Sequence, residues 1–123
     1  MFSILAIAAF GLIGIFCRFG IDQLLASANE TFPVSTFLIN IVGSALAGMI
    51  FVFGEREIFS PGVQLGLLVG FCGGFTTFSS YSLQTLVMAE QGRWIPALSY
   101  WMFSPVIGFL AAMGSVILSR KWI

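Results

Sequence analysis

The sequence predicts an all-α membrane protein with four transmembrane helices, and its composition and the spacing of its charges support this fold class. Of the 123 residues, 59% are hydrophobic and 8% are charged, whereas charged residues make up about 25% of a typical soluble domain. A bilayer core of about 30 Å requires roughly 20 apolar helical residues. Uncharged runs of suitable length occupy residues 1–17 (continuing past Arg18 to Ile21), 31–54, 58–89 and 94–119.

We expect one transmembrane domain, residues 1–123, with short connections between its helices. Pro33 and Pro61 stand where the second and third helices begin, and proline suits the first turn of a helix. The predicted helices cover about residues 2–26, 33–54, 61–90 and 94–119.

The first helix carries Gly11, Gly14 and Arg18 on one narrow face. The two glycines admit a close neighbouring helix. Arg18 has two open interpretations: an end residue that extends its charge to the interface, or a charge that orients a pore mouth. We also expect it to pair with Asp22, one turn later.

The second helix contains one amide side chain, Asn40, about a third of the way along its length. Polar residues inside a membrane face the bundle interior or a cavity because hydrocarbon offers no hydrogen-bond partner. Asn40 is therefore either a clamp between helices or part of a polar pathway, and the pattern leaves both open.

The third uncharged run is too long for one straight, upright helix. Residues 58–89 would extend about 48 Å at about 1.5 Å per residue, so the run must tilt, overhang or break. Its centre lies between Gly73 and Gly74, and each glycine weakens a helix by about 1 kcal/mol. We predict a break near the membrane midplane, with an unbroken helix that carries a packing notch as the alternative.

Beyond these glycines, polar and aromatic side chains recur at helical spacing. Thr77, Ser80 and Gln84 share a face, beside a ridge that includes Phe78 and Tyr81. In the fourth helix, Tyr100, Ser104 and Gly108 recur every four residues. Such stripes are consistent with a pore lining or with ordinary packing, since a Ser or Thr hydroxyl also bonds the carbonyl one turn back.

The basic residues divide almost evenly between the two sides of the membrane. Four spans put both termini and the second loop on one side, with Arg56, Arg120 and Lys121, and leave Arg18 and Arg93 on the other. Lys/Arg asymmetry sets orientation, and here it is small. We therefore hypothesise insertion in both orientations and an antiparallel homodimer.

The inventory of reactive groups argues against several classes of function. The chain has no histidine, and its five acidic residues fall near the predicted ends of helices or in loops, so neither an enzyme nor a proton-coupled small multidrug exporter is favoured. No basic patch indicates nucleic-acid binding. The remaining neutral donors and phenyl edges suit a passive pore for a small anion.

Three segments resemble the CrcB/Fluc family of fluoride channels, and the resemblance extends along essentially the whole chain. They are F-G-L-I-G-I-F-C-R-F (10–19), S-T-F-L-I-N-I-V-G (35–43) and, most specifically, G-F-C-G-G-F-T-T-F-S-S-Y (70–81).

The resemblance implies an antiparallel, dual-topology homodimer with a broken third helix, two fluoride pores and a structural Na⁺ at the dimer interface. The Na⁺ would be held by the backbone carbonyls of Gly73 and Thr76, and Arg18 matches the arginine that ends the first helix. The fluoride pore would comprise Asn40, Phe78, Tyr81, Thr77, Ser80, Tyr100 and Ser104.

The sequence departs from the family pattern at two positions of the expected pore. Tyr81 stands where a second phenylalanine is usual, so that its hydroxyl is expected to add a donor. Gly108 stands where some relatives carry a serine. The implied function is passive export of cytoplasmic fluoride across the bacterial inner membrane, and the alternatives are a small multidrug transporter or a structural helical subunit.

Overall fold

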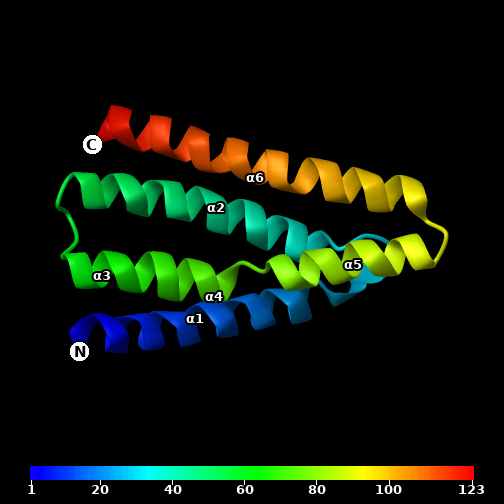
Figure 1. Ribbon diagram of the computed structural model, residues 1–123, viewed down its shortest axis with the longest axis horizontal. Coiled ribbons are helices and arrows are strands. Elements are labelled where there is room, and N and C mark those ends of the chain that lie inside the picture. Colours follow the sequence, from blue (N-terminus) through cyan, green and yellow to red (C-terminus); the bar gives the residue numbers. More distant parts are fainter.

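The computed structural model describes all 123 residues and is entirely helical (Figure 1). Four helical spans are long and apolar enough to cross a membrane, which confirms the predicted number. The third is divided into consecutive segments, the second of them π-helical. In chain order the elements are α1 (Phe2–Leu24), η1 (Ala26–Glu30), α2 (Val34–Glu55), α3 (Pro61–Leu65), η2 (Gly66–Cys72), α4 (Gly73–Phe75), α5 (Phe78–Glu90) and α6 (Trp94–Trp122).

The four spans run roughly parallel to the long axis of the molecule (Figure 1). Both termini and the α2–α3 connection lie at one end, and the α1–α2 and α5–α6 connections lie at the other, as the sequence predicts. The α2 helix packs mainly against α6, and α1 packs against η2 and α4. The third span is thus shared between two neighbours: its first half contacts α1, and α5 contacts α6.

Close packing in the first half of the third span depends on residues without side chains. A Cβ atom on Gly14 of α1 would lie 2.4 Å from the Phe71 carbonyl oxygen, and one on Gly74 would lie 2.7 Å from the Gly11 carbonyl oxygen. Both distances are too short for real atoms. The expected close neighbour of the Gly11 and Gly14 face is therefore the third span itself.

The chain after α1 does not continue as the helix expected to residue 26. It turns into the short 3-10 helix η1, from which Asn29 bonds both the backbone N–H and the hydroxyl of Ser35. The Ser35 hydroxyl in turn donates to Asp22 at 2.5 Å. The expected Arg18–Asp22 pair is wrong: the only ion pair joins Arg120 to Glu55, because Asp22 is engaged by the start of α2.

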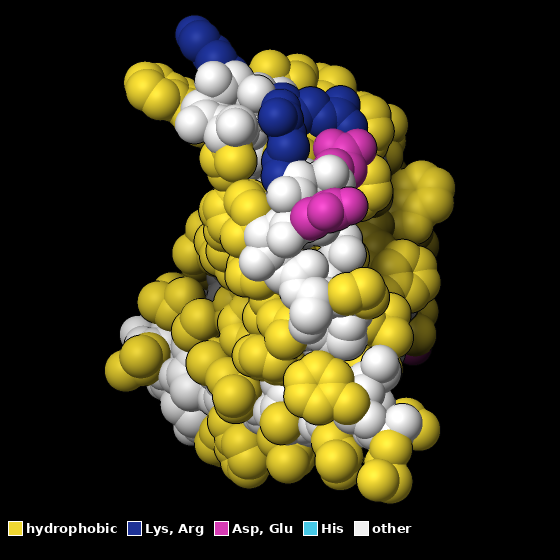
Figure 2. All heavy atoms as spheres, turned by 90° about the vertical axis from the view of Figure 1, so that its left-hand side faces the viewer, with side chains coloured by type: hydrophobic (Ala, Val, Ile, Leu, Met, Phe, Trp, Pro, Cys, Tyr) yellow, Lys and Arg dark blue, Asp and Glu magenta, His cyan; other side chains and the backbone are white.

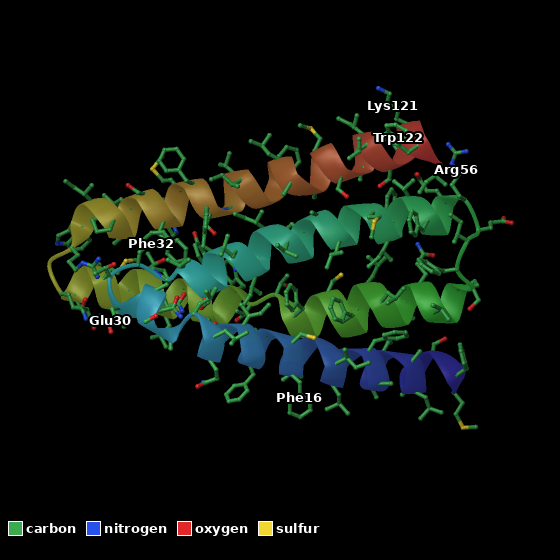
Figure 3. The ribbon with its side chains drawn as sticks, turned by 180° about the vertical axis from the view of Figure 1, so that it is seen from behind. Phe16, Glu30, Phe32, Arg56, Lys121 and Trp122 are labelled. Atoms are coloured by element: carbon green, nitrogen blue, oxygen red, sulfur yellow. The ribbon has the colours of Figure 1, made fainter.

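The outer surface is predominantly apolar and its charges gather at the ends. Figure 2 faces the end with the termini, where basic and acidic side chains cluster and hydrophobic ones cover most of the rest. Figure 3 shows Arg56, Lys121 and Trp122 at that end, Glu30 at the opposite end, and Phe16 pointing away from the bundle. This distribution suits a multi-pass membrane protein whose sides contact lipid or another apolar surface.

Candidate functional site

The third span is interrupted by two extended residues, Thr76 and Thr77, between α4 and α5. Their backbone angles are φ −80°, ψ 159° and φ −149°, ψ 116°. Gly73 itself is helical, with φ −64° and ψ −37°. The interruption therefore lies three residues beyond the predicted centre, because hydrogen-bonding partners, rather than glycine weakness, determine where the helix stops.

Those partners take two N–H groups away from the helical ladder. In a continuous helix, the N–H of Thr77 would bond the Gly73 carbonyl, four residues earlier. Here it donates to Asn40 Oδ1 at 2.8 Å. Likewise the N–H of Ser80 donates to Thr77 Oγ1 at 3.2 Å instead of to the Thr76 carbonyl. The carbonyls of Gly73 and Thr76 thereby lose their usual i+4 donors.

Asn40 connects α2 to this interruption through two hydrogen bonds. Its Oδ1 accepts from the Thr77 N–H, and its Nδ2 donates to the Thr77 carbonyl at 3.1 Å. A primary amide has two N–H donors, so one remains for a further partner. The interpretation of Asn40 as a clamp between helices is confirmed. Asn40 also lines a pocket, and its part in a polar pathway stays a prediction.

The pocket beside Asn40 lies between α2, α5 and α6 and has a volume of about 320 Å³. It combines hydroxyls, an amide and aromatic rings, and it has no Asp, Glu, Lys or Arg in its wall. Four predicted pore residues meet here, one of which is Asn40. The lining residues are Asn40, Ser44, Ala47, Phe78, Tyr81, Ser104, Pro105, Gly108, Phe109 and Ala112.

Phe78 is the most open of the predicted pore residues. Its side chain is 79% exposed although it begins α5 next to the interruption. The ring centroids of Phe78 and Tyr81 lie 5.5 Å apart. An exposed phenyl ring beside the interruption of a membrane span offers a contact surface for an ion, a lipid or a second subunit.

Tyr81 lies deeper, 5% exposed, and its hydroxyl is already engaged. It donates to the Trp101 carbonyl oxygen of α6 at 2.5 Å. The expectation that this hydroxyl adds a free donor to the pore is wrong, because its proton is committed to α6. The ring still borders the pocket.

Thr77 and Ser80 act together as the cap of α5. The Thr77 hydroxyl accepts from the Ser80 N–H and donates to the Ser80 hydroxyl at 3.1 Å. Thr77 also borders a smaller pocket of about 180 Å³ with Asn40, whereas Ser80 lines neither pocket. The predicted polar face shared with Gln84 is thus divided, since Thr77 precedes the helix.

Tyr100 belongs to a separate polar chain that crosses three helices. It is 1% exposed, and its hydroxyl donates to Gln84 Oε1 at 3.2 Å. Gln84 Nε2 donates to Thr36 Oγ1 of α2 at 2.9 Å. Ser104, one turn beyond Tyr100, does reach the pocket with Asn40. Helical spacing placed Gln84 near Thr77 but gave no indication of Thr36.

Ser44 is a lining residue that is absent from the pore set predicted from the sequence. It borders both pockets, and its hydroxyl donates to the Asn40 carbonyl at 2.7 Å. It faces buried Gly108, on which a Cβ would lie 3.3 Å from Ser44 Oγ. Ser44 thus packs where Gly108 has no side chain. The sequence feature that could have identified Ser44 as a lining residue is its position one helical turn after Asn40.

Arg18 is half-buried near the carboxyl end of α1 and forms no ion pair. It lines none of the pockets described here. Its role at a pore mouth stays a prediction.

Comparison with known proteins assigns the family. Residues 5–116 match the family model described as CrcB-like protein, Camphor Resistance (CrcB). A protein of Chlorobium luteolum named fluoride-specific ion channel FluC is 36% identical over 121 residues, covering 98% of this chain and 94% of its own. Identically named proteins of Geobacter sulfurreducens and Helicobacter pylori are 33% and 30% identical, covering 98% and 92% of this chain and 99% and 89% of their own. The chain belongs to the CrcB family.

Proposed function

We propose that this chain is a fluoride-selective ion channel that lets fluoride leave the cytoplasm passively across the bacterial inner membrane. The observation that carries the proposal is the pocket at the helix interruption, which is lined by neutral donors and aromatic rings, in a chain whose relatives are named fluoride-specific ion channels. Such a channel is not an enzyme and needs no chemical step.

The pocket chemistry suits a small, strongly hydrated anion. The free N–H of Asn40 and the hydroxyl of Ser104 are donors without net charge, and the edges of Phe78 and Tyr81 carry the positive part of the ring quadrupole. Together they would replace part of the water shell around fluoride. Because no fixed positive charge lines the pocket, the ion would not be trapped, which conduction requires. Thr77, Ser80 and Tyr100 would complete the pathway indirectly, by holding α5 and its neighbours.

A passive channel is sufficient for export under bacterial conditions. Hydrogen fluoride enters as a neutral acid and ionises at the higher internal pH. An inside-negative potential then drives the anion outward with about 2.3 kcal/mol per charge per 100 mV. The structure offers no acidic residue in the pocket wall for proton coupling, which favours this function over a multidrug exporter.

The interruption fits a bound sodium ion near the membrane midplane. The carbonyls of Gly73 and Thr76 lack their i+4 donors, since the corresponding N–H groups bond Asn40 and Thr77 instead. Carbonyl oxygens are suitable ligands for a hard cation, and bare backbone at that depth needs such a partner. Bound there, Na⁺ would neutralise these dipoles and stabilise the interruption. Retention of radiolabelled sodium by the purified protein tests this site.

An antiparallel homodimer would cover surfaces near the interruption that are exposed in a single subunit. Gly73 is exposed and has no atom within 4 Å of a Cβ built on it, and Phe78 is 79% exposed. A second copy in the opposite orientation would cover both and bring a second pair of carbonyls to the sodium ion. The nearly even division of basic residues between the two ends supports this arrangement.

Fluoride efflux from proteoliposomes tests the function directly. Vesicles loaded with potassium fluoride and opened to potassium by valinomycin should release fluoride, followed with a fluoride electrode, without a proton gradient. Release no faster than from loaded vesicles without protein would refute the channel. Release only under an imposed proton gradient would instead indicate a coupled transporter.

A further inference from the structure

The α6 helix contains a proline in its interior, Pro105, and continues on both sides of it. Proline has no backbone N–H, so it cannot donate to the carbonyl four residues earlier. In α6 that acceptor is the carbonyl of Trp101. Inside a membrane span no bulk water replaces the missing donor.

Tyr81 of the neighbouring helix α5 provides the missing hydrogen bond. Its hydroxyl lies 2.5 Å from the Trp101 carbonyl oxygen. The other contacts of the ring fix its orientation: it packs edge-on against Tyr100 with centroids 5.1 Å apart, and against Phe78 at 5.5 Å. Tyr81 is therefore held at both its hydroxyl and its ring.

The same residues meet at the candidate site. Pro105 and Tyr81 both line the pocket with Asn40, so the carbonyl released by the proline is bonded next to the pocket wall. A phenylalanine at position 81 would fill the same ring space but would leave the Trp101 carbonyl without a donor. The identity of residue 81 is thereby connected to the proline on another helix.

We propose that Tyr81 is a positioning residue whose hydroxyl replaces the helical donor that Pro105 removes, and so fixes the Tyr81 ring and the α5–α6 spacing at the pocket. Its effect on fluoride rests on the proposed function, whereas the hydrogen bond itself does not. The hydroxyl matters only while residue 105 is proline. A ring that served as packing alone would not depend on position 105.

A double-mutant cycle tests this dependence through efflux. Tyr81→Phe should still conduct, with efflux lowered about threefold, the size expected for one hydrogen bond between membrane helices. Pro105→Ala restores an N–H for the Trp101 carbonyl, so adding Tyr81→Phe to it should change efflux much less. An equal effect of Tyr81→Phe in both backgrounds would overturn the proposal.

Ser82→Ala is the matched control on α5. Its hydroxyl donates to the Phe78 carbonyl one turn back, within the same helix. Removing it should have the same effect whether residue 105 is proline or alanine. If the effect of Ser82→Ala depends on residue 105 as strongly as that of Tyr81→Phe, the cycle reports a general destabilisation of α5. That result would overturn the specific pairing of Tyr81 with Pro105.

Carbon-13 NMR of the Trp101 carbonyl tests the hydrogen bond independently of transport. Protein labelled at tryptophan carbonyls, with Trp94 and Trp122 replaced by phenylalanine, gives one resonance. It should move upfield in Tyr81→Phe, and stay nearly unmoved when Tyr81→Phe is added to Pro105→Ala. An unmoved resonance in Tyr81→Phe alone would refute the hydrogen bond. If it moves while the wild-type protein conducts no fluoride, the pairing stands and the proposed function fails.

Discussion

Asn40 and Thr77 exchange two hydrogen bonds across 37 positions of the sequence: Asn40 donates to the Thr77 carbonyl at 3.1 Å, and the Thr77 N–H donates to Asn40 Oδ1 at 2.8 Å. The Asn40 amide thus bonds both backbone groups of Thr77, its N–H and its carbonyl, which in a continuous helix would bond other backbone groups. This pairing also leaves a second amide N–H beside the pocket. The interruption of the third span and the candidate anion pathway therefore depend on the same side chain.

Asn40→Asp should lower fluoride efflux about tenfold or more. An ionised aspartate cannot donate to the Thr77 carbonyl, so two oxygens would face each other, and an unsatisfied buried acceptor costs about 1–3 kcal/mol. Its negative charge would also repel fluoride. Efflux from proteoliposomes measures the effect.

Ser115→Ala is the control for losing a hydrogen bond between helices, since Ser115 of α6 donates to the Ala45 carbonyl of α2 away from the pocket. It should conduct at nearly the wild-type rate. Wild-type efflux from Asn40→Asp would contradict the assignment of Asn40 to the pathway.

Phe78→Ile should slow efflux by about tenfold while leaving folding intact. The side chain is 79% exposed in the subunit, so its replacement creates no cavity within the subunit, but the aromatic ring in the pocket wall is lost. Efflux and size-exclusion chromatography measure transport and assembly separately.

Leu86→Ile, another exposed position on α5, introduces the same branched side chain away from the pocket with Asn40. We expect it to behave as wild type. If Phe78→Ile conducts as well as Leu86→Ile, the ring has no part in permeation.

Composition was sufficient to predict the four spans, because each needs only length and apolarity. It was not sufficient for the position of the interruption. Gly73 and Gly74 mark the centre of the run, yet both are helical, because the helix stops where Asn40 of another span captures the Thr77 N–H. A partner that distant is not visible in local helix propensity.

The hydrogen bonds between helices likewise could not be predicted from the spacing of residues along the sequence. Spacing along α1 brings Arg18 and Asp22 one turn apart, but η1 folds back and places Ser35 at the carboxylate. Similarly, Gln84 was recognised as polar, but its link to Tyr100 and Thr36 requires three helices to be in place. Spacing along one helix shows which side chains can meet, but the partner that each one takes depends on the neighbouring helices.

Gly73→Ala and Gly74→Ala should have different consequences, although the glycines are adjacent. A Cβ on Gly74 would lie 2.7 Å from the Gly11 carbonyl oxygen, so we expect the folded subunit to lose about 1–3 kcal/mol. A Cβ on Gly73 meets nothing within its own subunit. Gly73→Ala should therefore fold normally and, if a second copy covers this position, weaken the dimer.

Thermal unfolding and the monomer–dimer ratio in detergent separate the two effects. Gly114→Ala is the matched control for Gly73→Ala, since it too has open space around its Cβ position. A dimer weakened equally by both, or by neither, would count against Gly73 as part of the interface.

Gly108→Ala should slow efflux moderately by narrowing the pocket at Ser44. The added Cβ would lie 3.3 Å from Ser44 Oγ, which is tight enough that Ser44 must shift by a few tenths of an ångström. Ser44 bonds the Asn40 carbonyl at 2.7 Å, so a displaced hydroxyl would disturb the turn that carries Asn40. We expect efflux to fall about threefold, corresponding to one weakened hydrogen bond in a membrane. Combining Gly108→Ala with Ser44→Ala removes the hydroxyl that the new methyl crowds, and should recover part of the loss. No recovery in the double variant would show that Gly108 acts on the pathway through something other than Ser44.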